Sequence, residues 1–595
     1  MSRSDRFPLG ALPTDAGVLF RVWAPRAEHV DVVLTETDAV YPMDAVGRGY
    51  FERTVPGIGA GTRYKFRLDG DAVYPDPASR YQPEGVHGPS MVVDPSAYAW
   101  QDAGWTGRPL QGLVFYELHV GTFSPEGTFA GVRERLPYLR DLGVTAVELM
   151  PVADFPGRWN WGYDHAALYA PSRAYGTPDD LRALVDEAHR LGMAVFLDVI
   201  YNHLGPDGAY AAAYGPFFTS KHRTPWGDAI NLDDEGSEGV RHFFLDNALH
   251  WLREYHVDGF RLDATHALFD DSPTHFLAEL SAAVAALDEG PRRWLIAEDH
   301  RNLNTLVRPR SEGGYGLDGV WVDDVHHLLR NMTAGDTEGY YADFRDATAA
   351  QLAKALNQGW YYDGQRSPTS GRPRGTDATP VRHEQCVVFI QNHDQVGNRP
   401  LGDRLHHRIP LPVYRAASAT ILLAPELPLL FMGQEWAAST PFLFFSDHAP
   451  ELGRLVTEGR KKEFDAFSGF QGDVPDPQDP ATFERSRLRW EERAQPPHAG
   501  MHRLYRDLLR LRRDLPADAE AHAHGPRGLT LRRGPYLIAI ALADDLRLPW
   551  PAGAELVWHS EQPEYAEAPR PPVIEGARIH FPVAGAAVAR TEQPG

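Results

Sequence analysis

Short apolar runs alternate with amphipathic segments along most of the chain, from about residue 110 to about residue 515. One unit shows the pattern well. Thr177 can cap a helix that has Pro178 at its first position, and the apolar stripe of this helix stops at Gly192. An apolar strand over 193–199 follows directly. Such alternation predicts βα units stacked around a parallel sheet.

Eight apolar runs of strand length recur in this pattern, separated by helices such as those expected over 240–255 and 502–513. Eight parallel strands close into a (β/α)8, or TIM, barrel, so we predict the α/β class with this barrel over 106–518. That span exceeds the ~250 residues typical of the fold, and the excess must lie in loops. The predicted strands are 114–120, 145–151, 193–199, 257–263, 294–298, 319–323, 387–393 and 427–431.

The two ends of the chain have a different pattern, in which short β-rich runs are separated by Pro and Gly turns. Runs at 18–23 and 63–68 are examples. We therefore predict an N-terminal β-sandwich over 1–105 and a C-terminal β-sandwich over 519–595.

Charge and composition narrow the classes of partner. The formal net charge of −22 would repel polyphosphates and anionic lipid, so the prediction is no nucleic acid, no membrane and a neutral substrate. The first 17 residues have no continuous apolar stretch, and no run approaches the roughly 18 apolar residues of a membrane span. The single cysteine, Cys386, is predicted to be a buried strand residue, and it has no second cysteine with which to form an internal disulfide. A cytoplasmic location is expected.

In a TIM barrel the chemistry lies at the carboxyl ends of the strands. Four predicted strand ends carry carboxylates there, in the segments 198–203, 259–263, 296–299 and 391–395. Strand alternation puts Arg261 and Asp263 on one face, where the cation can keep Asp263 ionised and nucleophilic. Crowding by Asp263 and Asp394 should raise the proton affinity of Glu298, as a general acid requires.

Each of these residues also has a plainer interpretation. A lone Asp at a strand end is more often a helix cap, and a lone His is more often a core residue, but four carboxylate ends together favour a site. His203 and His393 both follow Asn at the barrel mouth and are candidates for holding sugar hydroxyls. Among the aromatic residues of 159–163, Tyr163 and Trp161 are candidates for stacking on a pyranose ring.

The four strand-end segments resemble the ordered signature regions of the α-amylase family, and they occur in the same order. The resemblance implies that Asp263 is the nucleophile, Glu298 the acid/base and Asp394 the carboxylate that stabilises the transition state. It also implies accessory roles at the positions that match the family's remaining pattern, Arg261, His203, His393, Asp198 and Asn202.

Narrower similarity is present in FRVWAPRAEHVDVVL and DPASRYQPEGVHGPS, which resemble the N-terminal region of maltooligosyltrehalose trehalohydrolases and of glycogen branching enzymes. The N-terminal sandwich is therefore expected to be similar to a carbohydrate-binding module. The barrel loops, among them NQGWYYDGQRSP and LLFMGQEWAASTPFLFFSDH, resemble the trehalohydrolase pattern rather than the branching one.

This resemblance implies hydrolysis of the α-1,4 bond next to the terminal trehalose of a maltooligosyltrehalose, and metabolic coupling to a maltooligosyltrehalose synthase. Asp299, His300 and Asp324 are the candidates for the trehalose side of the cleft. We expect no cofactor. Beyond Asn202 and residues near 228–234, the sequence has no dense Asp/Asn loop of the kind that holds calcium, so no metal is expected either.

Three alternatives stay open from the sequence. A glycogen branching enzyme or a debranching enzyme would share the sandwich and the three carboxylates. A non-catalytic glucan-binding protein of the same fold would lack one of those carboxylates, and none is missing here.

Overall fold

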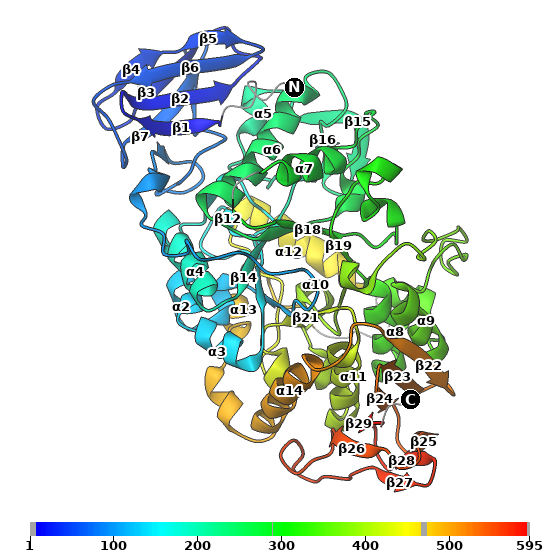
Figure 1. The fold of residues 1–595 in the computed structure, drawn as a ribbon. Coiled ribbons are helices and arrows are strands. Elements are labelled where there is room, and N and C mark those ends of the chain that lie inside the picture. The colour runs from blue at the N-terminus through cyan, green and yellow to red at the C-terminus, as the bar shows by residue number, and fades with distance from the viewer. Residues whose placement is uncertain (1–7, 288–289, 466–472, 592–595) are drawn as a thin grey trace.

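The computed structural model describes residues 8–287, 290–465 and 473–591. Residues 1–7, which belong to the N-terminal stretch without a continuous apolar run, lie outside the described residues. Figure 1 shows a small sheet domain at the N-terminal end, a large central body, and a second small sheet domain at the C-terminal end. Within the described ranges, no helix is long and apolar enough to cross a membrane.

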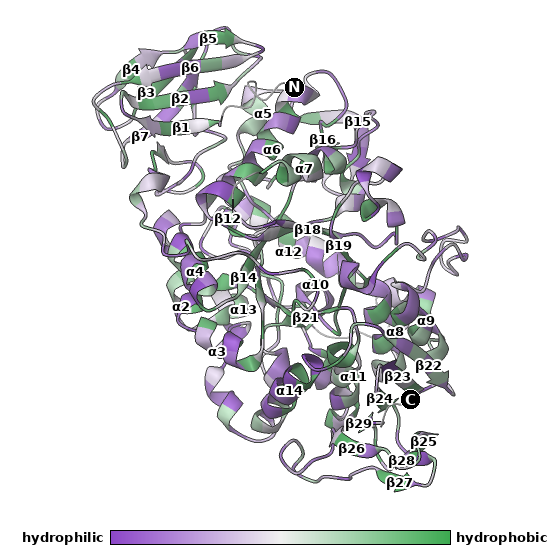
Figure 2. Ribbon diagram, viewed as in Figure 1, coloured by the Kyte–Doolittle hydropathy of each residue, from purple (hydrophilic) through white to green (hydrophobic). Residues whose placement is uncertain are grey.

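The N-terminal part is a sandwich of two antiparallel sheets, as predicted. Alternate residues of its strands face the core: Phe20 in β2 (Gly17–Trp23) and Phe66 in β7 (Arg63–Leu68) are fully buried. Figure 2 shows the matching bands of hydrophobic and hydrophilic residues along these strands. One sheet contains β1 (Gly10–Thr14), β2, β6 (Tyr50–Val55) and β5 (Asp44–Gly47), and the other β4 (Ala39–Pro42), β3 (Val30–Leu34), β7, β8 (Ala72–Tyr74) and β9 (Ser90–Met91).

Eight parallel strands form a closed barrel and follow one another around it in chain order, so the predicted TIM barrel is confirmed. Each predicted strand is present, most of them shorter than expected. The strands are β10 (Phe115–Leu118), β11 (Ala146–Leu149), β14 (Ala194–Val199), β17 (Gly259–Leu262), β18 (Trp294–Glu298), β19 (Gly319–Trp321), β20 (Cys386–Val388) and β21 (Leu427–Phe431). Cys386 begins β20 and is buried, as expected.

The barrel interior changes from apolar to charged toward the carboxyl ends of the strands. Phe115, Phe196 and Ile296 belong to one apolar cluster with interior residues of the other strands. Because side chains alternate along a strand, the residue two positions later faces the same side. Those later residues are Glu117, Asp198 and Glu298. The apolar floor therefore carries a charged layer at the barrel mouth.

The predicted helices are also present. Thr177 caps α4 (Pro178–Arg190) through a capping box with Asp180, and the two others begin three or four residues earlier than expected, as α6 (Ser237–Glu254) and α14 (His498–Arg512). The further helices are α1 (Val120–Phe123), α2 (Phe129–Arg133), α3 (Leu136–Leu142), α5 (Ala211–Tyr214), α7 (Phe276–Ala285), α8 (Asp323–Ala334), α9 (Ala349–Gln358), α10 (His393–Gly397), α11 (Leu411–Leu423), α12 (Pro450–Asp465) and α13 (Pro480–Arg485).

The excess length of the barrel lies in its loops. Two small antiparallel pairs are inserted there, β12 (Ala153–Asp154) with β13 (Ala167–Pro171), and β15 (Phe218–Thr224) with β16 (Gly227–Ile230). Each pair lies between a barrel strand and the helix that follows it, and such connections are at the carboxyl ends of the strands. They therefore add walls around the barrel mouth.

The C-terminal part is built of two antiparallel sheets with a shared apolar core, which includes Leu537, Leu548 and Ile579. The larger sheet contains β22 (Glu520–His524), β23 (Gly528–Arg533), β24 (Tyr536–Ala541), β29 (Gly585–Arg590) and β26 (Glu555–His559). The smaller sheet contains β25 (Leu546–Pro549), β28 (Arg578–Phe581) and β27 (Val573–Glu575). We propose domain limits of 1–105, 106–518 and 519–595, because β9 ends before and β22 begins after these boundaries.

A buried ion pair joins the N-terminal sandwich to the barrel through Arg80, which lies between β8 and β9. The Arg80 guanidinium donates to both carboxylate oxygens of Glu254 at the end of α6, with Nη2 to Oε1 at 2.7 Å, and to the backbone oxygen of Leu9. The Arg80 side chain is 3% exposed. This contact ties the N-terminal segment to a helix of the barrel.

We expect Arg80→Ala to lower the free energy of unfolding by about 3–5 kcal/mol, because Glu254 would be left buried without this partner. Chemical denaturation monitored by fluorescence measures the change. Arg67→Ala is the control, since Arg67 pairs with Asp31 on the sandwich surface and should contribute about 1 kcal/mol or less. Equal losses in the two variants would contradict the interpretation.

Candidate active site

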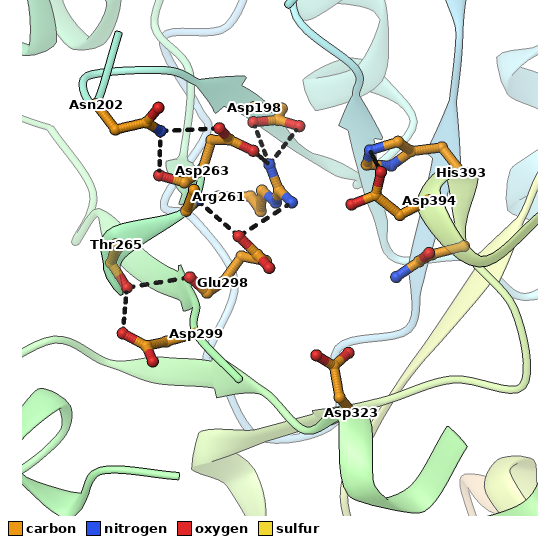
Figure 3. Close-up of polar contacts among 12 residues, drawn as sticks. Asp198, Asn202, Arg261, Asp263, Thr265, Glu298, Asp299, Asp323, His393 and Asp394 are labelled. Carbon is orange, nitrogen blue, oxygen red and sulfur yellow. Dashed lines mark hydrogen bonds and ion pairs between the residues drawn. The ribbon is translucent and has the colours of Figure 1, made fainter. Parts of the chain in front are cut away.

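A cavity of about 880 Å³ opens at the carboxyl ends of the barrel strands. This volume falls within the range typical of small-molecule sites. Six of the predicted site residues line the cavity: Asp263, Glu298, Asp394, Tyr163, His203 and His300. The three carboxylates of the predicted catalytic set therefore share one cavity, and Figure 3 shows Asp394 across open space from the other two.

Asp263 follows β17 and is held by two donors. Arg261 Nη1 lies 2.6 Å from Oδ1, and Asn202 Nδ2 lies 2.9 Å from Oδ2. Burial alone would raise the pKa of Asp263, but these contacts and the nearby His203 outweigh burial and hold the pKa below its usual value. Asp263 is therefore an ionised carboxylate with a fixed orientation.

Glu298 is the last residue of β18 and has the opposite electrostatic state. Its Oε2 atom accepts the backbone N–H of Ala264 at 2.6 Å and lies 3.7 Å from Arg261 Nη2. Burial and the charges of Asp263, Asp323 and Asp394 raise the pKa of Glu298 well above its usual value, although Arg261 lowers it. Glu298 therefore keeps its proton to higher pH than an ordinary glutamate, beside an ionised Asp263.

Arg261 lies between these carboxylates at the centre of the charged layer. It is fully buried, its guanidinium lies 4.5 Å from the centre of the Trp321 ring, and Nη1 donates to both oxygens of Asp198 at 2.9 Å. Figure 3 shows Arg261 between Asp198, Asp263 and Glu298. Burial raises the pKa of Asp198 to about 6 despite this cation.

Asp394 belongs to a short helix rather than to the end of a strand. The strand predicted over 387–393 ends at Val388, and Asn392 caps α10, with its side chain accepting the N–H of Gln395. Asp394 Oδ1 accepts from Asn398 Nδ2 at 3.1 Å, and the side chain is 43% exposed, toward the cavity. Backbone donors at the start of a helix favour a negative charge at this place.

Tyr163 and His203 form part of the cavity wall and have fixed orientations. The Tyr163 hydroxyl donates to Asp198 Oδ2 at 2.6 Å and lies 2.7 Å from His393 Nε2, and its ring stacks on that imidazole. The His203 ring stacks on Trp226 with centroids 4.6 Å apart. Burial and the neighbouring His266 lower the pKa of His300 to about 4, so His300 is neutral at neutral pH.

The remaining predicted residues lie behind the cavity wall. Arg261, His393, Asp198 and Asn202 support the lining residues from the barrel interior. Trp161 is buried and donates to Leu443 O, and Asp299 contacts Thr265 and Arg301. Asp324 is fully buried and accepts from Asn302, Arg374 and the backbone of 361–362. The structure therefore does not place Trp161, Asp299 or Asp324 in the cavity.

Other cavity residues were not expected from the sequence. Asp323, the first residue of α8, lines the cavity, and burial raises its pKa to about 7. Asp323 is the last residue of the predicted strand 319–323. The search for carboxylates at strand ends, which identified Glu298, could therefore also have identified Asp323. Trp226, 51% exposed, and Arg374 come from loops. No sequence signal places loop residues of this kind.

One group of side chains outside the cavity has the arrangement of a metal site. Ligand atoms of His222, Asp233 and Asp271 lie within 4.8 Å of one another at the base of the β15–β16 pair. The Lys221 ammonium already lies 2.8 Å from Asp233 and 3.4 Å from Asp271. Lysine thus supplies the cation that these carboxylates need, and the expectation of no metal stays a prediction.

Comparisons with known proteins agree with this architecture. A family model described as the alpha amylase catalytic domain matches residues 73–219, and one described as carbohydrate-binding module 48 (isoamylase N-terminal domain) matches residues 8–96. A malto-oligosyltrehalose trehalohydrolase of Deinococcus radiodurans is 51% identical, over 86% of this chain and 84% of its own. One of Rhizobium sp. is 42% identical, over 98% and 99%. A crystal structure from Salmonella typhimurium, described as an alpha amylase, superposes with a TM-score of 0.89 at 38% identity, covering 98% of this chain and 99% of the other.

Proposed function

Because this chain belongs to the α-amylase family, and within it to the malto-oligosyltrehalose trehalohydrolases, we propose that it hydrolyses the α-1,4 bond next to the terminal trehalose of a maltooligosyltrehalose. The products are trehalose and a shortened maltooligosaccharide. One observation carries the chemistry: Arg261 contacts both Asp263 and Glu298, whose pKa values are displaced in opposite directions. Paired carboxylates with separated protonation states are what acid-assisted glycoside cleavage requires.

The first step forms a glycosyl-enzyme. Glu298 gives its proton to the glycosidic oxygen while an Asp263 oxygen attacks the anomeric carbon, and the bond from that carbon to the leaving trehalose breaks. Arg261 and Asn202 orient the attacking carboxylate. The close spacing that one shared guanidinium imposes on Asp263 and Glu298 suits direct attack rather than attack by an intervening water.

The second step releases the sugar. Glu298, now ionised, removes a proton from water, the water oxygen attacks the anomeric carbon, and the Asp263 ester bond breaks. Two inversions give net retention. Asp394, exposed to the cavity on the opposite side, binds ring hydroxyls and is placed to stabilise positive charge that develops at the anomeric centre.

The residues around this trio divide by their place in the structure. We propose that Tyr163 and His203 contact sugar directly, whereas Asp198 and His393 act by orienting Arg261 and Tyr163. On the trehalose side, His300 lines the cavity. Asp299 and Asp324 would act through Arg301 and Arg374, and Trp161 through the packing of its loop.

The wider predictions follow from this chemistry. A neutral oligosaccharide suits an acidic protein, so we propose no nucleic-acid partner, and metabolic supply of substrate by a maltooligosyltrehalose synthase. The two-step reaction needs no cofactor. A cytoplasmic location stays a prediction.

The pKa displacements predict the pH dependence of kcat/KM. Asp263 acts in its ionised form, so activity is lost as pH falls through a pKa below the usual ~3.9; Glu298 acts protonated, so activity is lost as pH rises through a pKa above the usual ~4.3. The Asp323 charge contributes to the raised pKa of Glu298. Asp323→Asn should therefore move the alkaline limb to lower pH and leave the acid limb in place. An alkaline limb that stays fixed or moves upward would refute this electrostatic account.

Product analysis with maltotriosyltrehalose beside maltopentaose tests the proposed function. We expect preferential release of trehalose from the first and slow cleavage of the second. Amylose separates the nearest alternatives, because a branching enzyme would transfer chains and change its iodine absorbance. Extensive chain transfer without trehalose release would favour branching, and no turnover of any glucan would favour a non-catalytic binding protein.

A further inference from the structure

Glu117 is a buried carboxylate of β10 that the reaction steps above do not use. Its Oε2 atom accepts the backbone N–H of His393 at 2.9 Å, and its Oε1 atom contacts the Nδ1 atom of the same residue. Both side chains are 1% exposed. Glu117 therefore holds His393 at two points, one in the backbone where α10 begins and one in the imidazole ring.

The other ring nitrogen of His393 also faces an acceptor. The Tyr163 hydroxyl donates its proton to Asp198, so its oxygen is left to accept from His393 Nε2 at 2.7 Å. Asp394 Oδ1 lies 3.5 Å from the same nitrogen. A neutral imidazole carries a proton on one nitrogen alone, whereas two acceptors need a proton on each. The contacts thus fit an imidazolium.

The surroundings of His393 decide whether this charge is stable. Burial alone would lower the pKa of His393, but Glu117 and Asp394 outweigh burial and raise the pKa to about 9, with Arg261 acting in the opposite direction. A buried cation without such a partner is strongly disfavoured. The titratable and charged groups that face His393 are Glu117, His119, Glu148, Tyr163, Asp198, Arg261 and Asp394.

We propose that Glu117 is a positioning residue, which keeps His393 as an imidazolium and fixes the start of α10, and thereby orients Tyr163 and Asp394 toward the sugar. Glu117 itself does not reach the cavity and touches no substrate. The interpretation of the expected changes in rate rests on the proposed function. The proposal requires the negative charge of the Glu117 side chain, and not only its size and shape.

A neighbouring residue supplies a matched control. Glu148 of β11 stands directly opposite Glu117 in the strand register, is equally buried, and has no hydrogen-bond partner for either carboxylate oxygen within the described part of the chain. Burial, together with the charges of Glu117 and Asp198, raises the pKa of Glu148 well above its usual value and so favours its neutral form. Glutamine at 148 therefore breaks no hydrogen bond of a carboxylate and keeps the favoured neutral state, whereas glutamine at 117 removes the counter-ion of His393.

The experiment compares Glu117→Gln, Glu117→Asp and Glu148→Gln in the full chain. The amide oxygen of glutamine at 117 can accept the backbone N–H of His393, and its N–H can donate to the Nδ1 atom of a neutral imidazole, so the ring keeps a partner but loses its counter-ion. We expect kcat at neutral pH to fall about 10- to 100-fold, as when an outer carboxylate partner of a functional histidine is removed. The deficit should shrink as pH is lowered, because His393 regains its proton. Glu117→Asp, which keeps the charge, should recover part of the rate, and Glu148→Gln should stay within about twofold of wild type.

A spectroscopic measurement decides the proposal without reference to substrate. In protein labelled with 15N at histidine, the ring nitrogens of His393, assigned by their loss in His393→Asn, should show the imidazolium form at pH 7 in wild type and Glu148→Gln. They should show the neutral form in Glu117→Gln. An imidazolium that persists in Glu117→Gln, or rate losses that are equal and independent of pH at positions 117 and 148, would overturn the proposal. If wild type fails to release trehalose, the proposed function fails while this spectrum still decides the role of Glu117.

Discussion

Replacing Asp263 with Asn should lower kcat by at least about 10³-fold, the largest loss that we expect from any single substitution. The variant keeps the size of the side chain and can still accept from Arg261, but a neutral amide cannot form the ester with the anomeric carbon. Steady-state release of trehalose from maltotriosyltrehalose measures the loss. The thermal unfolding midpoint should remain close to that of wild type, because the ion pair of Arg261 with Asp198 persists.

Asp141→Asn is the control for the loss of one carboxylate. Asp141 lies on α3, and its side chain is 67% exposed. Within the described part of the chain, the ion pair found for Asp141 is with its neighbour Arg140. The turnover of the Asp141→Asn variant should equal that of wild type. If Asp263→Asn kept turnover within tenfold of wild type, another residue would have to be the nucleophile.

Replacing Glu298 with Gln should also lower kcat by at least about 10³-fold on the natural substrate, since the leaving trehalose needs a proton. The loss should be much smaller on an α-glucosyl fluoride, if the cavity accepts it, because fluoride leaves without protonation. Sodium azide should speed the second step, since azide attacks the glycosyl-enzyme without a general base. This pattern would distinguish loss of the acid/base from misfolding.

The control here is Asp263→Asn under the same conditions. It lacks the nucleophile, so neither the fluoride nor azide should restore its turnover by the retaining route. Equal losses on the two substrates for Glu298→Gln, with no effect of azide, would contradict the acid/base role.

The barrel and its charged mouth could be predicted because both follow from local rules. Strand periodicity puts Arg261 and Asp263 on one face, and closure of eight strands brings Glu298 beside them. The same rules account for the full set of eight strands. Because neighbouring strands are aligned, the acidic residues that follow the apolar interior residues lie together at the barrel mouth.

Other features depend on the point at which a strand gives way to a helix. The strand predicted to 393 stops at Val388, and α10 begins at His393, so Asp394 reaches the cavity from a helix start. At the start of α8, Asp323 faces the cavity while Asp324 turns into the loop behind it. These two adjacent acidic residues point in different directions because the backbone turns into a helix here. The residue types alone do not show where this turn occurs.

The positions of the loop residues that line the cavity could not be predicted from the sequence for a different reason. Trp226 reaches His203 from the β15–β16 pair, and Arg374 reaches Asp324 across 50 residues of sequence. Such contacts depend on how long insertions fold against the barrel. They carry no periodicity, so position in the sequence gives no indication of them.

The central claim is that this chain releases trehalose with retention of configuration, by way of Asp263 and Glu298. Proton NMR of maltotriosyltrehalose hydrolysis, recorded from the first turnovers, tests both parts in one measurement. The account predicts that trehalose signals grow together with the α-anomer of maltotriose, and that the β-anomer appears only later by mutarotation. First appearance of the β-anomer, or chain shortening without trehalose, would contradict it.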